Sequence, residues 1–256
     1  MMTHNTLEQL RGLRLTGMAQ ALTEQLTQPA STELAFEERL ALLVDREILS
    51  REQRRYQRLI TAARLKYSQA AIEDLDTRAG RGLDRAAITS LVLGDWITAG
   101  QTVTITGPTG AGKTWLACAL GQYACRRGHS VRYLRVPRLA EELRIQHGAG
   151  TFSKWLLAVE KTDLLVLDDW GLTALPASAR SDLMELIDDR AGTRATVITS
   201  QLPIEHWHGW IGDATIADAI LDRLTHHHHR ITIEGDSLRR QPARPRHQEK
   251  KEETNP

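Results

Sequence analysis

The chain has 256 residues, 41% of them hydrophobic and 25% charged, which is the composition of an ordinary globular protein. Its formal net charge of +1 provides no overall attraction to nucleic acid, so any basic surface must arise from local segregation of charge. No apolar run approaches the length of a membrane span, and the first residues lack the apolar core of a signal peptide. We therefore expect a soluble cytoplasmic protein with no membrane partner.

The chain contains two cysteines, Cys118 and Cys125. They form no Cys-x-x-Cys pair and no Cys/His cluster at zinc spacing, which excludes a disulfide scaffold and favours a reducing compartment. Because they are seven residues apart in a predicted helix, they would share a face and serve in packing.

The first part of the chain is predicted to be helical. Residues 1–73 carry apolar residues at helical spacing, for example Phe36, Leu40, Leu43 and Val44, and predict a small all-helical N-terminal domain. Residues 74–90 include the polar, glycine-bearing stretch "DLDTRAGRGLD" and form the predicted linker. At the other end, residues 239–256 have almost no apolar side chains and predict a disordered basic tail.

Residues 91–238 alternate short β-branched runs with helical segments. The predicted strands are "TVTIT", "VRYL", "LLVLDD", "ATVITS" and "RITI". Strands that alternate with helices predict an α/β domain of three layers around a parallel sheet.

The stretch "GPTGAGKT" lies between the first predicted strand and a helix, and it matches the pattern G-x-x-x-x-G-K-[ST]. Its glycines allow backbone N–H groups to approach phosphate oxygens, and the helix adds its positive N-terminal end. Lys113 would reach the β- and γ-phosphates of ATP, and Thr114 would hold Mg²⁺. The plain alternative is a glycine turn that closes a βα unit. The predicted nucleotide-binding residues are Gly107, Pro108, Thr109, Gly110, Ala111, Gly112, Lys113, Thr114 and Trp115.

Acidic and amide side chains follow two further predicted strands. Asp168 ends an apolar strand, where it would be the second protein ligand of Mg²⁺, and Asp169 would orient or deprotonate the attacking water. The alternative is an acidic cap between strand and loop. Gln201 follows "ATVITS" and would position the same water, or would simply end the strand.

Several motifs in this order resemble the IstB-type helper ATPases of insertion-sequence transposition, AAA+ proteins related to the DnaC-type loaders of replicative helicases. The resemblance is dense in the α/β half and looser in the N-terminal part. It is carried by "GPTGAGKTWLACALG", "LLVLDDWGL", "VITSQLP", "IADAILDRL" and "ITIEGDSLR", and by "LEQLRGLRLTGMAQAL" near the N-terminus.

The resemblance implies an AAA+ P-loop ATPase of the bacterial cytosol or nucleoid that forms homo-oligomers on DNA and recruits or activates a transposase. Arg223 matches the arginine finger, which acts on the nucleotide of a neighbouring subunit, and Arg239 matches the sensor-2 arginine. Asp169 replaces a more usual glutamate and Gln201 a more usual asparagine, which changes their reach to the water. Without the resemblance, Arg223 would be a helix-surface residue and Arg239 a tail residue.

Residues 46–66 carry seven Lys/Arg and two Glu, a local net charge of +5. In a helix, Arg51, Arg54, Arg55 and Arg58 would form one basic stripe able to contact phosphates of double-stranded DNA. The alternative is a solvated helix face. No base-reading motif is present, which favours contacts to the DNA backbone.

Two aromatic clusters invite other functions. The run of histidines at residues 226–229 precedes a predicted strand, and we interpret it as a solvated turn rather than a metal site. Trp207 and Trp210 could stack on bases or a partner, but such tryptophans more often cover a core.

The same residues fit two alternative functions. A helicase loader would share every AAA+ residue named above and differ in its partner. The second alternative is an ATP-switched module that assembles on DNA with little hydrolysis, because Asp169 replaces the more usual glutamate. A small-molecule P-loop kinase is disfavoured, since it has no use for "LDRL", "DSLR" or the helical N-terminal part.

Overall fold

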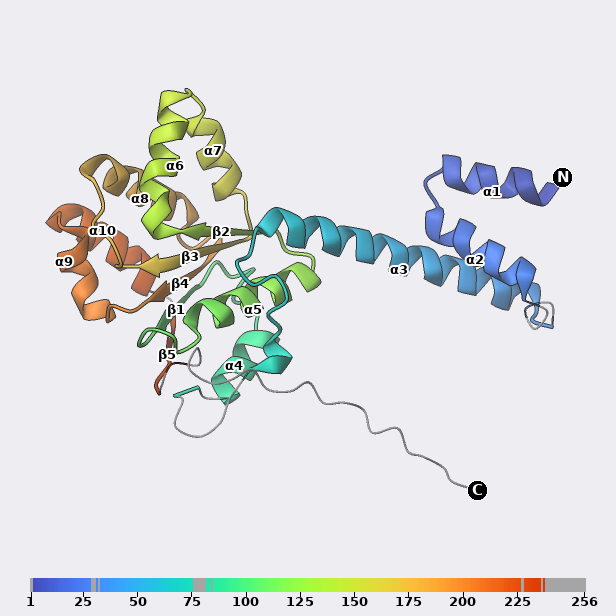
Figure 1. The fold of residues 1–256 in the computed structure, drawn as a ribbon, viewed down its shortest axis with the longest axis horizontal. Helices are drawn as coiled ribbons and strands as arrows, with labels where there is room; N and C mark the ends of the chain where they lie inside the picture. Colours follow the sequence, from blue (N-terminus) through green and yellow to red (C-terminus); the bar gives the residue numbers. More distant parts are fainter. Residues whose placement is uncertain are drawn as a thin grey trace, which may run out of the picture.

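The computed structural model describes residues 2–28, 31, 33–75, 82–83, 85–226, 228–235 and 237. A helical arm and an α/β unit make up this part of the chain (Figure 1). The arm consists of α1 (Met2–Gly12), α2 (Thr16–Thr27) and the long helix α3 (Phe36–Ala63). With its 28 residues, α3 is about 42 Å long and carries α1 and α2 at the end remote from the α/β unit.

The hairpin of α2 and α3 is held by close packing and by one buried carboxylate. A Cβ atom at Gly17 would lie 2.7 Å from the carbonyl oxygen of Arg46, so only glycine permits this approach. The side chain of Glu47 accepts hydrogen bonds from the backbone N–H groups of Gly17, at 2.7 Å, and Met18, at 3.2 Å. These N–H groups lie in the first turn of α2, where they have no partner within the helix.

The α/β unit contains a five-stranded sheet with the order β2-β3-β4-β1-β5, in which every pair is parallel. Its strands are β1 (Thr102–Thr106), β2 (Val131–Arg135), β3 (Leu164–Trp170), β4 (Ala195–Ser200) and β5 (His228–Thr232). The helices and short 3₁₀ segments are η2 (Ile72–Asp74), α4 (Arg85–Leu93), α5 (Lys113–Arg126), α6 (Val136–Gly148), α7 (Phe152–Glu160), α8 (Ala177–Arg190), η3 (Ile204–His206), α9 (Trp207–Ile211) and α10 (Ala214–Thr225).

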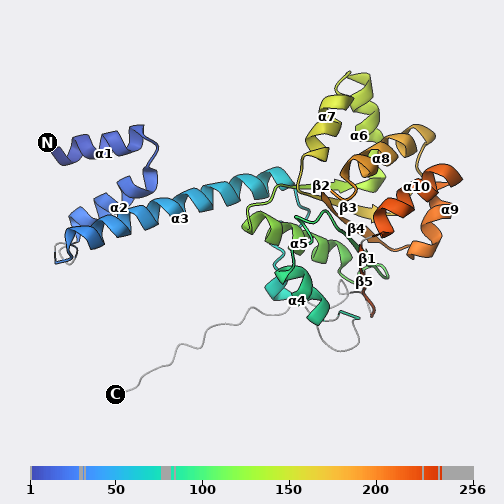
Figure 2. The same ribbon diagram turned by 180° about the vertical axis from the view of Figure 1, so that it is seen from behind.

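Alternation along β3 divides the core into two layers. Leu164 and Val166 pack on one face of the sheet with residues of α4 and α5, whereas Leu165 and Leu167 pack on the other with residues of α6 to α10. Figures 1 and 2 show these two helical layers on either side of the sheet. The predicted three-layer parallel α/β fold, preceded by a helical N-terminal part, is therefore confirmed.

The last turns of α3 dock on the α/β unit (Figure 2). The Arg55 guanidinium donates a 2.8 Å hydrogen bond to the carbonyl oxygen of Gly128, and Gln122 of α5 donates to the hydroxyl of Tyr56 at 3.1 Å. Ala63 at the helix end is fully buried in the first core layer. The end of the arm is therefore part of the same hydrophobic core as α5.

Several predictions concern segments that the structure describes only in part. Within the predicted linker, residues 76–81 and 84 lie outside the described residues, and residues 85–90 belong to α4. The predicted tail, residues 239–256, also lies outside them. The domain boundaries therefore remain a prediction.

The interpretation of the histidine run as a turn is wrong for its second half. His228 and His229 are the first residues of β5 and pair with Thr102 and Val103 of β1. Burial lowers the pKa of His229, whose Nε2 lies 2.8 Å from Oε1 of Gln101. Among the described residues no three His, Cys, Asp or Glu side chains are grouped as a metal site.

The tryptophans belong to the core of the second layer. Trp207 is fully buried, and its ring centroid lies 5.3 Å from that of Trp170 at the end of β3. Trp210 packs on the same ring at 5.0 Å. No described helix has the length and apolar character needed to cross a bilayer.

A buried arginine links the amino-terminal ends of the strands to helices α7 and α8. Arg190, at the end of α8, is 1% exposed. It donates to the carbonyl oxygens of Val159 in the last turn of α7, Thr162 just after α7, and Ala195 in β4. Burial lowers the pKa of this guanidinium to about 10, and no carboxylate of the described residues forms an ion pair with it. Its contribution is thus the hydrogen bonding of carbonyl groups that water cannot reach.

We expect Arg190→Met to lower the free energy of unfolding by about 3 kcal/mol or more, because several buried carbonyl groups would lose their donors. Urea denaturation measures the change. Arg194→Met is the matched control, since Arg194 is largely exposed and pairs with Asp163 at the surface, where loss of the pair should cost about 1 kcal/mol or less. Equal effects of the two substitutions would contradict this role of Arg190.

Candidate functional site

The loop between β1 and α5 has the backbone of a phosphate-binding loop. Gly107, Gly110 and Gly112 have φ angles of 148°, 83° and 103°, a region that side chains other than glycine rarely enter. A Cβ atom at Gly107 would overlap the carbonyl oxygen of Ile233, in the segment that follows β5. Since α5 begins at Lys113, the N–H groups of its first turn have no partner within the helix and lie beside this loop, as binding of an anion requires.

The Lys113 ammonium lies within the loop. Its Nζ donates hydrogen bonds to the carbonyl oxygens of Gly107, at 2.7 Å, and Pro108, at 2.8 Å. These carbonyls hold the ammonium beside the space that the loop encloses. A short movement of the side chain would exchange them for phosphate oxygens, which are stronger partners because they carry charge.

The Asp168 carboxylate is fully buried and accepts three hydroxyl hydrogen bonds. Its Oδ1 accepts from Thr114 of α5 at 2.8 Å and from Thr199 of β4 at 2.5 Å. Its Oδ2 accepts from Tyr133 of β2 at 2.6 Å. Burial and this hydrogen bond raise the pKa of Tyr133 well above its usual range.

The oxygen atoms of Thr114 and Asp168 suit magnesium, which prefers oxygen ligands. The Thr114 hydroxyl and the Asp168 carboxylate are adjacent, so one cation could be shared between them, directly or through water. The sequence-based pairing of these two residues is therefore reproduced by their geometry.

Asp169 lies in a β-bulge. Leu167 pairs with Ile198 and Trp170 with Ser200, so β3 has one more residue than β4 over this interval. The φ angle of Asp169 is 62°, a left-handed conformation that aspartate tolerates better than most residues. The bulge turns the Asp169 carboxylate away from Asp168 and toward Arg135, whose Nε donates to Oδ2 at 2.7 Å. This hydrogen bond raises the pKa of Arg135.

A pocket of about 380 Å³ lies between the loop and the carboxyl ends of β2, β3 and β4. It is lined by Lys66, Tyr67, Thr109, Gly110, Gly112, Lys113, Thr114, Trp115, Arg135, Asp169, Leu172 and Gln201. Among the predicted residues, Gln201 is brought to the loop, where its Oε1 accepts from the Thr109 hydroxyl at 2.6 Å. Gly107, Pro108, Ala111 and Asp168 support the pocket without lining it.

Four lining residues were not predicted. Arg135 ends a predicted strand, so its place at the shared edge of the sheet could have been inferred from the sequence. Leu172 follows the Asp168–Asp169 pair closely. Lys66 and Tyr67 come from the segment after α3, and no sequence pattern indicates that this segment reaches the loop.

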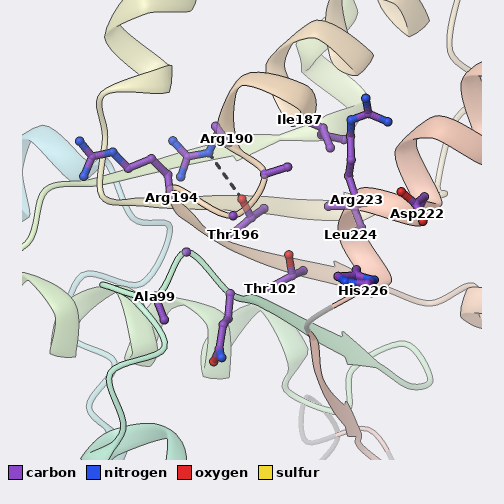
Figure 3. Close-up of a pocket in the computed structure, with 14 residues that line it drawn as sticks. Ala99, Thr102, Ile187, Arg190, Arg194, Thr196, Asp222, Arg223, Leu224 and His226 are labelled. Atoms are coloured by element: carbon purple, nitrogen blue, oxygen red, sulfur yellow. Dashed lines mark hydrogen bonds between the residues drawn. The ribbon is translucent and has the colours of Figure 1, made fainter.

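Arg223 lies away from this pocket. It is near the end of α10 and lines a second pocket, of about 330 Å³, with Thr102 and Thr196 at the amino-terminal edge of the sheet (Figure 3). Its Nε donates to Oδ1 of Asp188, and one terminal nitrogen donates to the carbonyl oxygen of Ala219 at 3.0 Å. Arg223 therefore cannot serve the nucleotide site of its own chain. Arg239 lies outside the described residues.

The arginines of α3 surround a shallow hollow, which also includes Arg14 from the turn between α1 and α2. Arg51 and Arg54 lie 2.8 Å and 3.4 Å from Oε1 of Glu47, and Arg55 donates to Gly128. Arg58 completes the group. The stripe predicted from spacing is thus one surface, and folding adds Arg14 to it.

Burial raises the pKa of Cys118 to about 11, and burial likewise raises that of Cys125. Both side chains pack in the first core layer, as predicted. A thiol with a raised pKa is a poor nucleophile at neutral pH.

We expect Gly107→Ala to destabilise the fold by about 1–3 kcal/mol and to weaken nucleotide binding, because Ala strains this backbone and its Cβ would displace the segment at Ile233. Thermal unfolding with and without Mg·ATP measures both effects. Gly148→Ala is the control, since nothing lies within 4 Å of a Cβ there. An unchanged thermal shift by Mg·ATP in Gly107→Ala would contradict the proposed geometry of the loop.

Solved structures show a similar fold. The DnaC helicase loader superposes with a TM-score of 0.56 at 20% sequence identity, over 66% of this chain and 99% of that chain. The replication initiator DnaA bound to AMPPCP and single-stranded DNA superposes with a TM-score of 0.54 at 19% identity, over 66% of this chain and 50% of that one. These likenesses concern the fold alone.

Sequence comparison is more specific. An ATP-binding protein of insertion sequence IS1162 from Pseudomonas fluorescens is 58% identical over 203 residues, 79% of this chain and 88% of that protein. An insertion-sequence ATP-binding protein of Sinorhizobium fredii is 48% identical over 244 residues, 95% of this chain and 99% of that protein. The model of a family described as "IstB-like ATP binding protein" matches residues 8–245. The chain therefore belongs to the family of IstB-like ATP-binding proteins, and its relatives include ATP-binding proteins of insertion sequences.

Proposed function

We propose that this protein is an ATPase that assembles as a homo-oligomer on double-stranded DNA and recruits or activates the transposase of an insertion sequence. Its place of action would be the bacterial cytosol or nucleoid. The observation that supports hydrolysis most directly is the contact between the Thr114 hydroxyl and the Asp168 carboxylate, with Lys113 in the adjoining loop. The names of the relatives, ATP-binding proteins of insertion sequences, support the transposition context.

The predicted site residues would divide the work of phosphoryl transfer to water. Lys113 and the loop N–H groups would bind the β- and γ-phosphates, while Thr114 and Asp168 would hold Mg²⁺. The ion would neutralise charge on the terminal phosphates. Asp169 would accept a proton from the attacking water, and Gln201 would orient that water while Thr109 fixes its amide. Arg239 would contact the phosphates as the sensor-2 residue.

One observation favours a protein that hydrolyses ATP slowly. Arg135 holds Oδ2 of the Asp169 carboxylate, so this oxygen must leave its partner before it can accept a proton from water. A module that assembles on DNA when ATP binds, and that turns over rarely, would fit this arrangement. A turnover assay on the unmodified protein with and without DNA separates the two functions.

The protein that this chain binds would distinguish a transposition helper from a helicase loader. The likeness to DnaC concerns the fold, whereas the relatives with the higher identities are insertion-sequence proteins. Capture of the purified protein by a transposase encoded with the same element would support the proposal. Capture by a replicative helicase instead would favour a loader.

Contact with DNA is proposed for the hollow on α3. Arg51, Arg54, Arg55 and Arg58, joined by Arg14, present several guanidinium groups on one surface. Guanidinium groups match phosphates in geometry and charge, and a backbone contact of this kind is independent of base sequence. Arg51 and Arg54 would share their charge with Glu47, so Arg58 and Arg55 are expected to contribute most.

Arg223 is proposed to act across a subunit interface. We expect Arg223→Ala to bind ATP but to turn it over about 10³-fold or more slowly, and Lys113→Ala to lose turnover by disabling its own pocket. When the two variants are mixed with DNA, some interfaces would join an intact pocket to an intact arginine. ATPase activity should therefore partly return.

Each variant alone, at the same total concentration, is the control for this mixing experiment. Absence of recovery in a sample shown to co-assemble would be evidence against action in trans. Turnover by Lys113→Ala at the rate of the unmodified protein would overturn the assignment of the pocket itself.

Replacing Arg54, Arg55 and Arg58 together by alanine should flatten the plot of log K for DNA against log salt by about 2.7 per subunit, if each residue neutralises one phosphate. Sequence preference should change little. The control is Arg11→Ala with Arg230→Ala, which removes exposed arginines outside the hollow. An unchanged slope in the triple variant would place the DNA contact elsewhere, most simply on the AAA+ domain.

A further inference from the structure

The segment that joins α3 to η2, residues 64–71, crosses the α/β unit next to the nucleotide pocket. We call it the strap. It begins at Arg64, which ends α3 in a left-handed conformation with a φ angle of 52°. Two of its residues, Lys66 and Tyr67, line the pocket that also contains Lys113 and Asp169. The arm and the nucleotide site are therefore joined by a few consecutive residues.

The strap is fixed at several points, so its position is defined. Leu65 is buried against α5, where its side chain would lie 3.0 Å from a Cβ atom at Gly121. The backbone of Lys66 and Tyr67 lies near the Cys118 thiol, one turn after Thr114, where it offsets part of the burial that raises the pKa of this cysteine. Ala70 is buried, and its N–H donates to the carbonyl oxygen of Tyr67 at 3.1 Å.

The strap shares the pocket with three residues at the carboxyl ends of the strands. These are Arg135, Asp169 and Gln201, at or just beyond the ends of β2, β3 and β4. In the proposed function, Asp169 and Gln201 address the water that attacks the γ-phosphate. Lys66 and Tyr67 therefore line the same pocket as the residues assigned to the reacting end of the nucleotide.

The charge of Lys66 has no carboxylate partner in the described part of the chain. Its Nζ lies 5.6 Å from the ring centroid of Tyr67, a cation–π contact that leaves the three N–H donors available. By contrast, Arg135 in the same pocket is paired with Asp169. A lysine at such a position provides a point charge on a flexible stem, suited to a phosphate that is present in only one nucleotide state.

We propose that Lys66 binds the terminal phosphate of ATP and that Tyr67 holds its ammonium group in place, an inference that rests on the proposed ATPase function. Loss of that phosphate on hydrolysis removes the contact. Because the strap continues directly from α3, the difference between ATP and ADP is then transmitted to the arm that carries the arginine hollow. The strap thus links nucleotide state to the affinity for DNA.

The test compares Lys66→Met with Lys66→Arg on the full chain. Affinities are measured for a non-hydrolysable ATP analogue and for ADP, both with Mg²⁺. We expect Lys66→Met to weaken the analogue about tenfold or more and ADP less than about twofold, since a charge-assisted contact to the γ-phosphate is lost. Lys66→Arg should restore most of the preference. Lys161→Met, at an exposed lysine after α7, is the matched control.

DNA binding provides a second measurement that a purely structural residue would not affect. In the unmodified protein we expect different DNA affinities with the analogue and with ADP, and in Lys66→Met we expect this difference to shrink. Equal weakening of the analogue and of ADP, or no change in either, would overturn the role of Lys66. Weaker DNA binding by the same factor in every nucleotide state would make Lys66 a DNA contact instead.

The unmodified protein and Lys113→Ala distinguish failure of this inference from failure of the proposed function. If the unmodified protein binds the analogue and Lys113→Ala does not, the nucleotide site is real and the Lys66 variants decide the inference alone. If the unmodified protein binds no nucleotide, the proposed function and the inference fall together.

Discussion

The carboxylate of Asp168 is the point at which the parts of the nucleotide site are joined. It is fully buried, and three hydroxyl groups from α5, β2 and β4 satisfy it. A buried carboxylate without such donors would be costly, so its burial ties the helix after the loop to the ends of two neighbouring strands. The loop geometry, the bulge at Asp169 and the approach of Gln201 all depend on strands that end together at this point.

The two edges of the sheet carry different halves of the proposed chemistry. The phosphate-binding loop and Asp169 lie at the carboxyl edge, whereas Arg223 lies at the amino edge beside Thr102 and Thr196. One chain therefore does not bring the arginine to its own nucleotide. In an assembly that places the amino edge of one subunit against the carboxyl edge of the next, each interface would contain a complete site. The isolated chain pairs both Asp169 and Arg223 internally, with Arg135 and Asp188, and assembly would have to exchange these partners.

The long helix α3 connects the arm directly to the core of the α/β unit. Its first half carries the hairpin with α2, which Glu47 caps, and its last turns pack on α5. Phe36, Leu40 and Val44 form the apolar periodicity that correctly predicted this helix, yet all three are exposed in the single chain. Periodicity reports which residues share a helix face, but only the packing of other elements decides whether that face is covered.

The sequence by itself determined the local features of this protein: the glycines and lysine of the loop, the acidic end of an apolar strand, and the alternation of strands and helices. These are set by neighbouring residues, because backbone conformation and strand polarity are local properties. Tertiary structure alone decided that Lys66 and Tyr67 reach the nucleotide pocket, that Arg14 joins the arginines of α3, and that Arg190 serves the carbonyl groups of Val159 and Thr162. It also decided that His228 and His229 belong to a strand, because pairing with β1 overrides the polarity of the run. Such contacts join residues far apart in the chain, and spacing along the sequence carries no information about them until the chain has folded.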